Sequence, residues 1–232
     1  RHTILQGDWE FRRVLFRSRC TPKNCRICQT IRGVFVVVNS HPVSVHVGFV
    51  RETLSGLARL ERDPGPFLER ANIPPELLEL PFARVSRTQF QTLVHSLMDE
   101  LDDEMMGHLA RPMRRGSFVF LCRASLFGAL SLHVVLARWV KVQRLLTDEI
   151  QLSFRREGNV AWLRLTGPSG AGDDTLTFLP MVHFKSLHIL ASWLVGERIR
   201  LSGVAFSGPR PAHGDEYARL FPGEVCFGAP VS

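Results

Sequence analysis

The clearest alternation of apolar and polar positions lies between residues 117 and 146 and predicts two helices joined by a short turn. Gly116 and Ser117 mark the start of the first helix, because a serine side chain can accept a backbone N–H of the first turn. Gly128 interrupts the pattern, and Ser131 is placed to cap the second helix. One face of that helix carries Leu132, Val135, Leu136, Trp139, Val142 and Leu146. Apolar faces of this size must pack against the rest of the chain.

Helical spacing also precedes this stretch, and a period of two follows it. We expect helices over residues 49–60, 67–71 and 90–101, and the last of these begins after Ser86. Residues 150–155 and 160–165 alternate between apolar and polar, which predicts a β-hairpin. The remaining expected elements are a helix over 177–195 closed by Gly196, a strand over 199–206, a short helix over 215–221 and a strand over 225–227. Together they predict an α+β fold, with an N-terminal helical bundle packed on a small antiparallel sheet and a helical crossover.

Residues 99–104 form an acidic run at the end of the helix expected over 90–101. We interpret it as a solvated helix end rather than as a metal site or a pair of catalytic carboxylates, because the acids are local and sit where a helix meets solvent.

The net charge of +7 is concentrated at the start of the chain. Residues 1–33 hold eight Lys and Arg against two acids, and the remaining residues hold 21 basic and 20 acidic side chains. Residues 1–18 have no consistent period and resemble a translated sequencing adapter. We therefore expect residues 1–33 to be a non-native or disordered lead-in, and residues 34–232 to form the functional domain. The near-neutral domain offers no basic stripe for binding nucleic acid directly.

The five cysteines do not suggest a disulfide framework, because their number is odd and their spacing wide. Cys20, Cys25 and Cys28 have spacing that zinc can use, but no second Cys or Cys/His pair follows at suitable spacing, and His41 is the nearest candidate for a fourth ligand. We expect no metal and no cofactor, and keep a zinc-dependent binding module as an alternative if this segment is native. No apolar run reaches the roughly 18 residues that span a bilayer, so we expect a cytoplasmic protein without membrane contact.

Three blocks of sequence, in this order and spacing, resemble the N-terminal arabinose-binding-type domain of AraC-type bacterial transcription regulators. The blocks are residues 48–57 continued by 63–78, residues 109–118, and residues 206–213 with Glu216, Tyr217, Leu220, Phe221 and 225–230. The resemblance covers roughly residues 43–232. It implies a domain that senses a small-molecule effector, forms a homodimer and controls DNA through a C-terminal helix-turn-helix domain, before which we expect this sequence to be truncated.

A sensing pocket requires a few polar groups in a largely apolar hollow. The candidate effector-binding residues are Arg115, Ser117, Arg123, Trp139, His183 and His188. Arg115 and Ser117 flank a helix N-terminus that can meet an anionic effector, although an ordinary cap beside a solvated arginine is the simpler explanation and the one we favour. Trp139 also fits a core position, and the two histidines are five residues apart, which is poor spacing for metal ligation.

The common catalytic motifs are absent from the sequence, which favours a binding function. The alternative is a small-molecule enzyme of α+β fold with an unrecognised site. Such an enzyme would require a deep pocket with convergent polar residues of perturbed pKa.

Overall fold

The computed structural model describes residues 44–167 and 173–229. The chain divides into two units, residues 1–41 and 42–232, and every described residue belongs to the second unit. The predictions made for Cys20, Cys25 and Cys28, and for the lead-in as a whole, lie outside the described residues.

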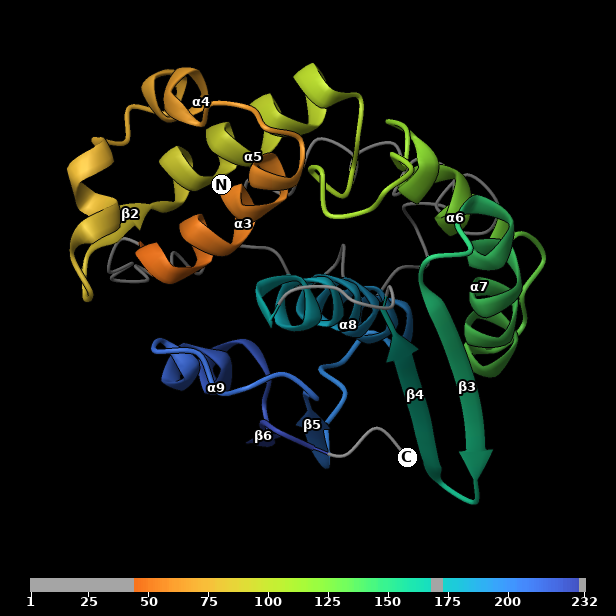
Figure 1. Cartoon of the computed structure of the whole chain (residues 1–232). Helices are drawn as coiled ribbons and strands as arrows, with labels where there is room; N and C mark the ends of the chain where they lie inside the picture. The colour runs from red at the N-terminus through yellow and green to blue at the C-terminus, as the bar shows by residue number, and fades with distance from the viewer. Residues whose placement is uncertain (1–43, 168–172, 230–232) are drawn as a thin grey trace, which may run out of the picture. The chain divides into compact units, whose positions relative to one another are not determined.

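The described part of the chain is a mixed helix and strand structure, which confirms the α+β class (Figure 1). Its elements are β1 (Ser44–His46), α3 (Val47–Arg59), α4 (Gly65–Arg70), η1 (Pro75–Glu79), β2 (Arg84–Ser86), α5 (Arg87–Leu101), α6 (Ser117–Leu126), α7 (Leu132–Leu146), β3 (Gln151–Glu157), β4 (Val160–Thr166), α8 (Asp173–Val195), β5 (Gly203–Ala205), η2 (Gly214–Glu216), α9 (Tyr217–Leu220) and β6 (Glu224–Cys226). The described strands form three separate pairs: β1–β2 and β3–β4 are antiparallel, and β5–β6 is parallel. Of the strand expected over 199–206, only the three residues of β5 form a strand.

The β1–β2 pair joins the segments that lead into α3 and α5, with Ser44 opposite Ser86 and His46 opposite Arg84. His46 begins α3, because its Nδ1 accepts the backbone N–H of Gly48 at 3.0 Å. Ser86 begins α5 with a capping box, in which Ser86 and Gln89 each bind the backbone N–H of the other. The main apolar core forms around α3, α4, α5, the first half of α8 and the C-terminal segment.

Helix α3 also lies unusually close to the loop that follows α5. A Cβ atom on Gly56 would come within 2.2 Å of the Met106 carbonyl oxygen, and one on Gly107 would come within 2.7 Å of the Gly56 carbonyl oxygen. Arg59 tightens this contact by donating to the carbonyl oxygens of Gly107 and Leu109. Glycine at position 56 thus permits a backbone approach that no side chain would allow.

Helices α6 and α7 confirm the paired helices predicted from the sequence, and they pack on each other. Ser131 caps α7 as expected, with its hydroxyl accepting the Val134 N–H. Helix α6 begins at Ser117 as predicted, but the capping role expected of the Ser117 side chain is wrong, because the N-cap residue is Gly116 and no side-chain cap is formed there.

The acidic run over residues 99–104 is a solvated helix end only in part: Asp99 and Glu100 are exposed as expected, but Asp103 and Glu104 are buried, which corrects the sequence interpretation for these two residues. Asp103 is 2% exposed and accepts backbone N–H groups from Met105, Gly107 and Met113 at 2.8–3.0 Å. Glu104 is also buried and accepts the N–H groups of Gly116 and Phe118 at 2.8 and 2.7 Å. The two carboxylates therefore organise the loop from Met105 onward and cap α6 from outside the helix.

The hairpin predicted after α7 is confirmed as β3 and β4, with Gly158 at positive φ in the two-residue turn. Its inner face carries Leu152 and Phe154, and Phe154 lies 5.2 Å from the ring of His133 on α7. In Figure 1 the two strands run side by side, and α7 packs next to β3.

Helix α8 includes residues 177–195, a stretch long and apolar enough to cross a membrane. Phe178, Leu179 and Met181 belong to the main apolar core, and the helix contacts α3 and α7. The core helix of a globular protein has the same length and composition, so these two properties do not assign α8 to a bilayer.

Candidate functional site

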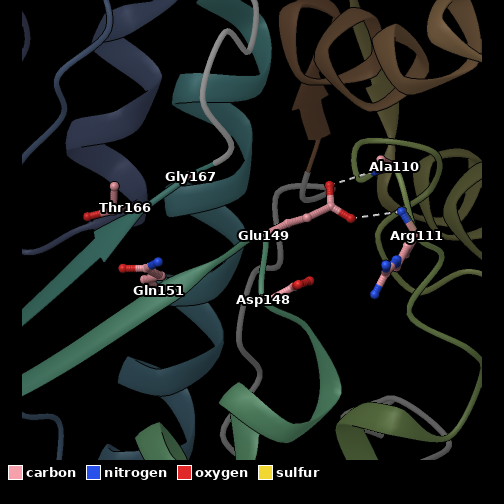
Figure 2. A pocket seen from close by; sticks show the side chains of 7 residues that line it. All are labelled: Ala110, Arg111, Asp148, Glu149, Gln151, Thr166 and Gly167. Carbon is pink, nitrogen blue, oxygen red and sulfur yellow. Dashed lines mark hydrogen bonds between the residues drawn. The ribbon is translucent and has the colours of Figure 1, made fainter.

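An open cleft of about 460 Å³ lies where the α5–α6 loop meets the base of the β3–β4 hairpin (Figure 2). Its lining residues are Ala110, Arg111, Asp148, Glu149, Gln151, Thr166 and Gly167. Gln151 and Thr166 face each other as a cross-strand pair, because they are opposite in the hairpin register. The lining is predominantly polar and combines one guanidinium with two carboxylates.

Glu149 holds the two walls of this cleft together. Its carboxylate oxygens accept the backbone N–H groups of Ala110 and Arg111 at 2.7 and 2.8 Å (Figure 2). With Glu149 occupied in this way, the exposed side chains of Arg111 and Asp148 remain as the charged groups of opposite sign. The cleft can therefore offer a cation, an anion and neutral hydrogen-bonding groups to a small polar molecule.

The structure places Arg115 and Ser117 at the start of α6, beyond the residues that line the cleft. Arg115 is exposed and forms an ion pair with Asp99 at 3.0 Å. The anion-binding interpretation of this helix start needs free backbone N–H groups, but those of Gly116 and Phe118 are bound by Glu104. The protein's own carboxylate thus occupies the position considered for an effector.

Arg123 and Trp139 lie on the α6–α7 pair. Arg123 is exposed in the last turn of α6. Trp139 is 2% exposed, donates its indole N–H to Gln143 and packs edge-on against Phe118 at 5.6 Å. The alternative noted for Trp139, a core position, is where the structure places it.

His183 and His188 both lie on α8, and each contacts a backbone carbonyl. His183 Nδ1 is 2.8 Å from the Leu179 carbonyl oxygen, and burial lowers its pKa. His188 Nε2 is 2.8 Å from the Ile199 carbonyl oxygen, and this contact ties α8 to the segment that follows it. No cluster of three or more metal-ligating side chains occurs among residues 44–167 and 173–229.

A buried polar network that the sequence analysis did not identify joins α3 to the C-terminal segment. The Tyr217 hydroxyl lies 3.0 and 3.1 Å from the two carboxylate oxygens of Glu52, and His213 Nε2 lies 3.1 Å from Oε1 of the same carboxylate. The His213 contact has ion-pair distance without hydrogen-bond geometry. All three side chains are buried, and His46 stacks on the His213 ring. Residues 165 positions apart are thereby held together.

This network joins the first and third sequence blocks. Glu52 belongs to the first block, and His213 and Tyr217 belong to the third. A Cβ atom on Gly48 would come within 2.3 Å of the His213 ring, so the same contact requires a glycine in the first block. A charged residue within an otherwise apolar helix face was the available signal, because a buried carboxylate needs a partner elsewhere in the chain.

The α+β fold and the polar cleft define a ligand-binding domain, and comparison with known families gives its class. The family described as the arabinose-binding domain of AraC transcription regulators, N-terminal, matches residues 62–232. This match covers well over half of the chain, so the chain belongs to this family of regulatory ligand-binding domains. The resemblance deduced from the sequence is confirmed, although residues 48–57 of the first block precede the matched region. A search of curated proteins found no match.

Proposed function

We propose that this chain is the effector-sensing and dimerising part of an AraC-type transcription regulator. In the intact protein, a C-terminal helix-turn-helix domain would bind DNA, and a cytoplasmic effector would shift the population of domain arrangements that permit this binding. The family match over residues 62–232 carries the proposal. The near-neutral composition of residues 34–232 is consistent with DNA contacts made elsewhere in the protein.

We place the effector in the cleft beside Arg111 and Asp148. The cleft presents both signs of charge next to the polar side chains of the cross-strand pair Gln151 and Thr166. Of the candidates proposed from the sequence, Arg123 keeps the role of a second, competing location at α6, whereas an effector at Arg115 and Ser117 would have to displace Glu104. Trp139, His183 and His188 have the internal contacts described above, and a role for them would require those contacts to rearrange.

A thermal-shift screen of polar metabolites against the full chain tests this proposal, because a ligand that binds the native state raises its melting temperature. An effector in the cleft predicts that Arg111→Gln reduces the shift while Arg123→Gln preserves it. The opposite pattern would place the effector at α6. No shift with any metabolite would contradict the sensing function, and an intact gene without a helix-turn-helix pair would contradict the regulatory one.

The enzyme alternative gains no specific support from the described residues. The polar side chains that converge on Glu52 are buried in the core, whereas the cleft at Arg111 is open to solvent. A reaction would require both features in one place. The family is one of regulatory ligand-binding domains, and we therefore propose that the chain has no catalytic activity.

A further inference from the structure

Charge is unevenly distributed along the described domain. Residues 44–110 hold 6 basic and 11 acidic side chains, of which the acidic Glu52, Asp103 and Glu104 are buried, whereas residues 111–167 hold 10 basic and 3 acidic ones. A count over the whole domain gives near neutrality and conceals this division. Surfaces of opposite sign on one molecule attract one another between copies.

The basic half exposes large apolar side chains along α7 and the turn before it, a surface that we call the basic stripe. It consists of Phe127, Leu130, Arg138, Lys141, Arg144 and Leu145. Leu130 is 99% exposed, Phe127 85% and Leu145 83%. Residues 138, 141 and 145 share one face of α7, because positions three and four apart are neighbours on a helix. The Arg138 guanidinium bonds to the Phe127 carbonyl oxygen, so the turn belongs to the same surface.

The acidic half contains a smaller surface of matching character, which we call the acidic turn. It consists of Glu76, Glu79, Leu80 and Phe82, all exposed, in and immediately after η1. Phe82 is 86% exposed, and neither glutamate forms an ion pair with another described residue. Arg51 donates to the carbonyl oxygen of Leu78, which lies between the two glutamates in the chain.

We propose that the acidic turn of one copy of this chain docks on the basic stripe of a second copy. Each surface places apolar anchors beside charges of a single sign, and the two signs are opposite. Such an arrangement suits a protein interface, with apolar side chains at its centre and charged groups at its rim. Nucleic acid is a poorer fit for the basic stripe, because protein–DNA interfaces are polar and Leu130 and Leu145 would face phosphates. The inference rests on the dimerising part of the proposed function and assigns its surfaces.

Charge reversal distinguishes the proposed docking from non-specific association. In one variant Glu76→Lys and Glu79→Lys make the acidic turn basic, and in the other Lys141→Glu and Arg144→Glu make the basic stripe acidic. Light scattering coupled to size-exclusion chromatography of the full chain should show an associated wild type and two monomeric variants. An equimolar mixture of the two variants should associate again, because each surface then meets one of opposite charge.

Matched controls use exposed charges outside both surfaces. Glu61→Lys and Arg164→Glu should leave the association unchanged, while Phe82→Ser and Leu130→Ser should weaken it at least tenfold without altering the circular dichroism spectrum. A monomeric wild type, variants that still associate alone, or a mixture that stays monomeric would each overturn the docking proposal. Binding of DNA by the basic stripe without self-association would overturn it as well. The metabolite screen is independent of these results, so failure of the docking leaves the sensing function to be judged by its own assay.

Discussion

Replacing Asp103 with asparagine isolates the contribution of one buried carboxylate to the fold. The change keeps the shape of the side chain but converts one oxygen into an NH₂ group. Oδ1 accepts two backbone N–H groups, from Met105 and Met113, and Oδ2 accepts that of Gly107. In the asparagine variant, the best arrangement keeps the two bonds at Oδ1 and turns the NH₂ group toward the Gly107 N–H, so that two donors face each other.

The expected magnitude follows from the burial of this site. A buried donor left without an acceptor costs about 1–3 kcal/mol, and a hydrogen bond to a charged group contributes about 1.5–3 kcal/mol. We therefore expect Asp103→Asn to lower the free energy of unfolding by about 2–3 kcal/mol. Asp103→Ala should lower it by about 3–5 kcal/mol, because all three N–H groups then lose their acceptor.

Urea denaturation followed by circular dichroism measures the difference, and the preceding residue supplies the control. Asp102 is partly exposed and pairs with Arg114 near the surface. Asp102→Asn should be much milder than Asp103→Asn, because water replaces the lost ion pair and asparagine tolerates the left-handed backbone found at this position. Equal losses for the two asparagine variants would refute the role assigned to Asp103.

Three further predictions concern contacts within the core. Gly56→Ala should lower the free energy of unfolding by about 2–4 kcal/mol, because its Cβ would collide with a backbone carbonyl oxygen at 2.2 Å; Gly65→Ala, where the nearest atom is a side-chain oxygen at 3.1 Å, should show a much smaller loss in the same thermal melts. Burial lowers the pKa of His108 to about 4, below its unfolded value of 6.5. Between these two pH values the unfolded state binds a proton at His108 and the folded state does not. Stability should fall by about 3 kcal/mol as the pH drops from 6.5 to 4, and His108→Phe should flatten that slope whatever its effect at neutral pH. Tyr217→Phe should cost about 1–3 kcal/mol in urea melts by removing a donor from the buried Glu52 carboxylate, and an unchanged midpoint would contradict this network.

The sequence predicted elements whose determinants are local. The helix caps act on backbone groups only a few positions away, and the caps at Ser86 and Ser131 are both present. The hairpin pattern is equally local, and its two strands are present as β3 and β4. Apolar spacing likewise predicted that Trp139 belongs on a packed face, which the structure bears out.

The long-range polar contacts could not be predicted in the same way. An acidic residue at a helix end is usually solvated, and nothing near Asp103 or Glu104 indicates that the following loop turns back to bind them. Ser117 shows the consequence, because the capping role expected of its side chain is taken by Glu104. This carboxylate accepts the N–H of Phe118, which lies 14 positions later in the chain. The candidate cleft was missed for a similar reason: Arg111 and Asp148 are separated by a helical pair and meet only through the Glu149 contacts.

The bond between Tyr217 and Glu52 has a consequence for the order in which a ribosome produces this domain. Helix α3 emerges early, with a carboxylate on the side that will later be covered, whereas the phenol that receives this carboxylate is made 165 residues later. Until Tyr217 has been made, Glu52 has to be hydrated by water. Burying that side of α3 before then would leave the carboxylate without the Tyr217 hydrogen bond, which costs free energy. Completion of the domain therefore waits until residue 217 has been made, and nascent chains ending before that residue should remain sensitive to proteases.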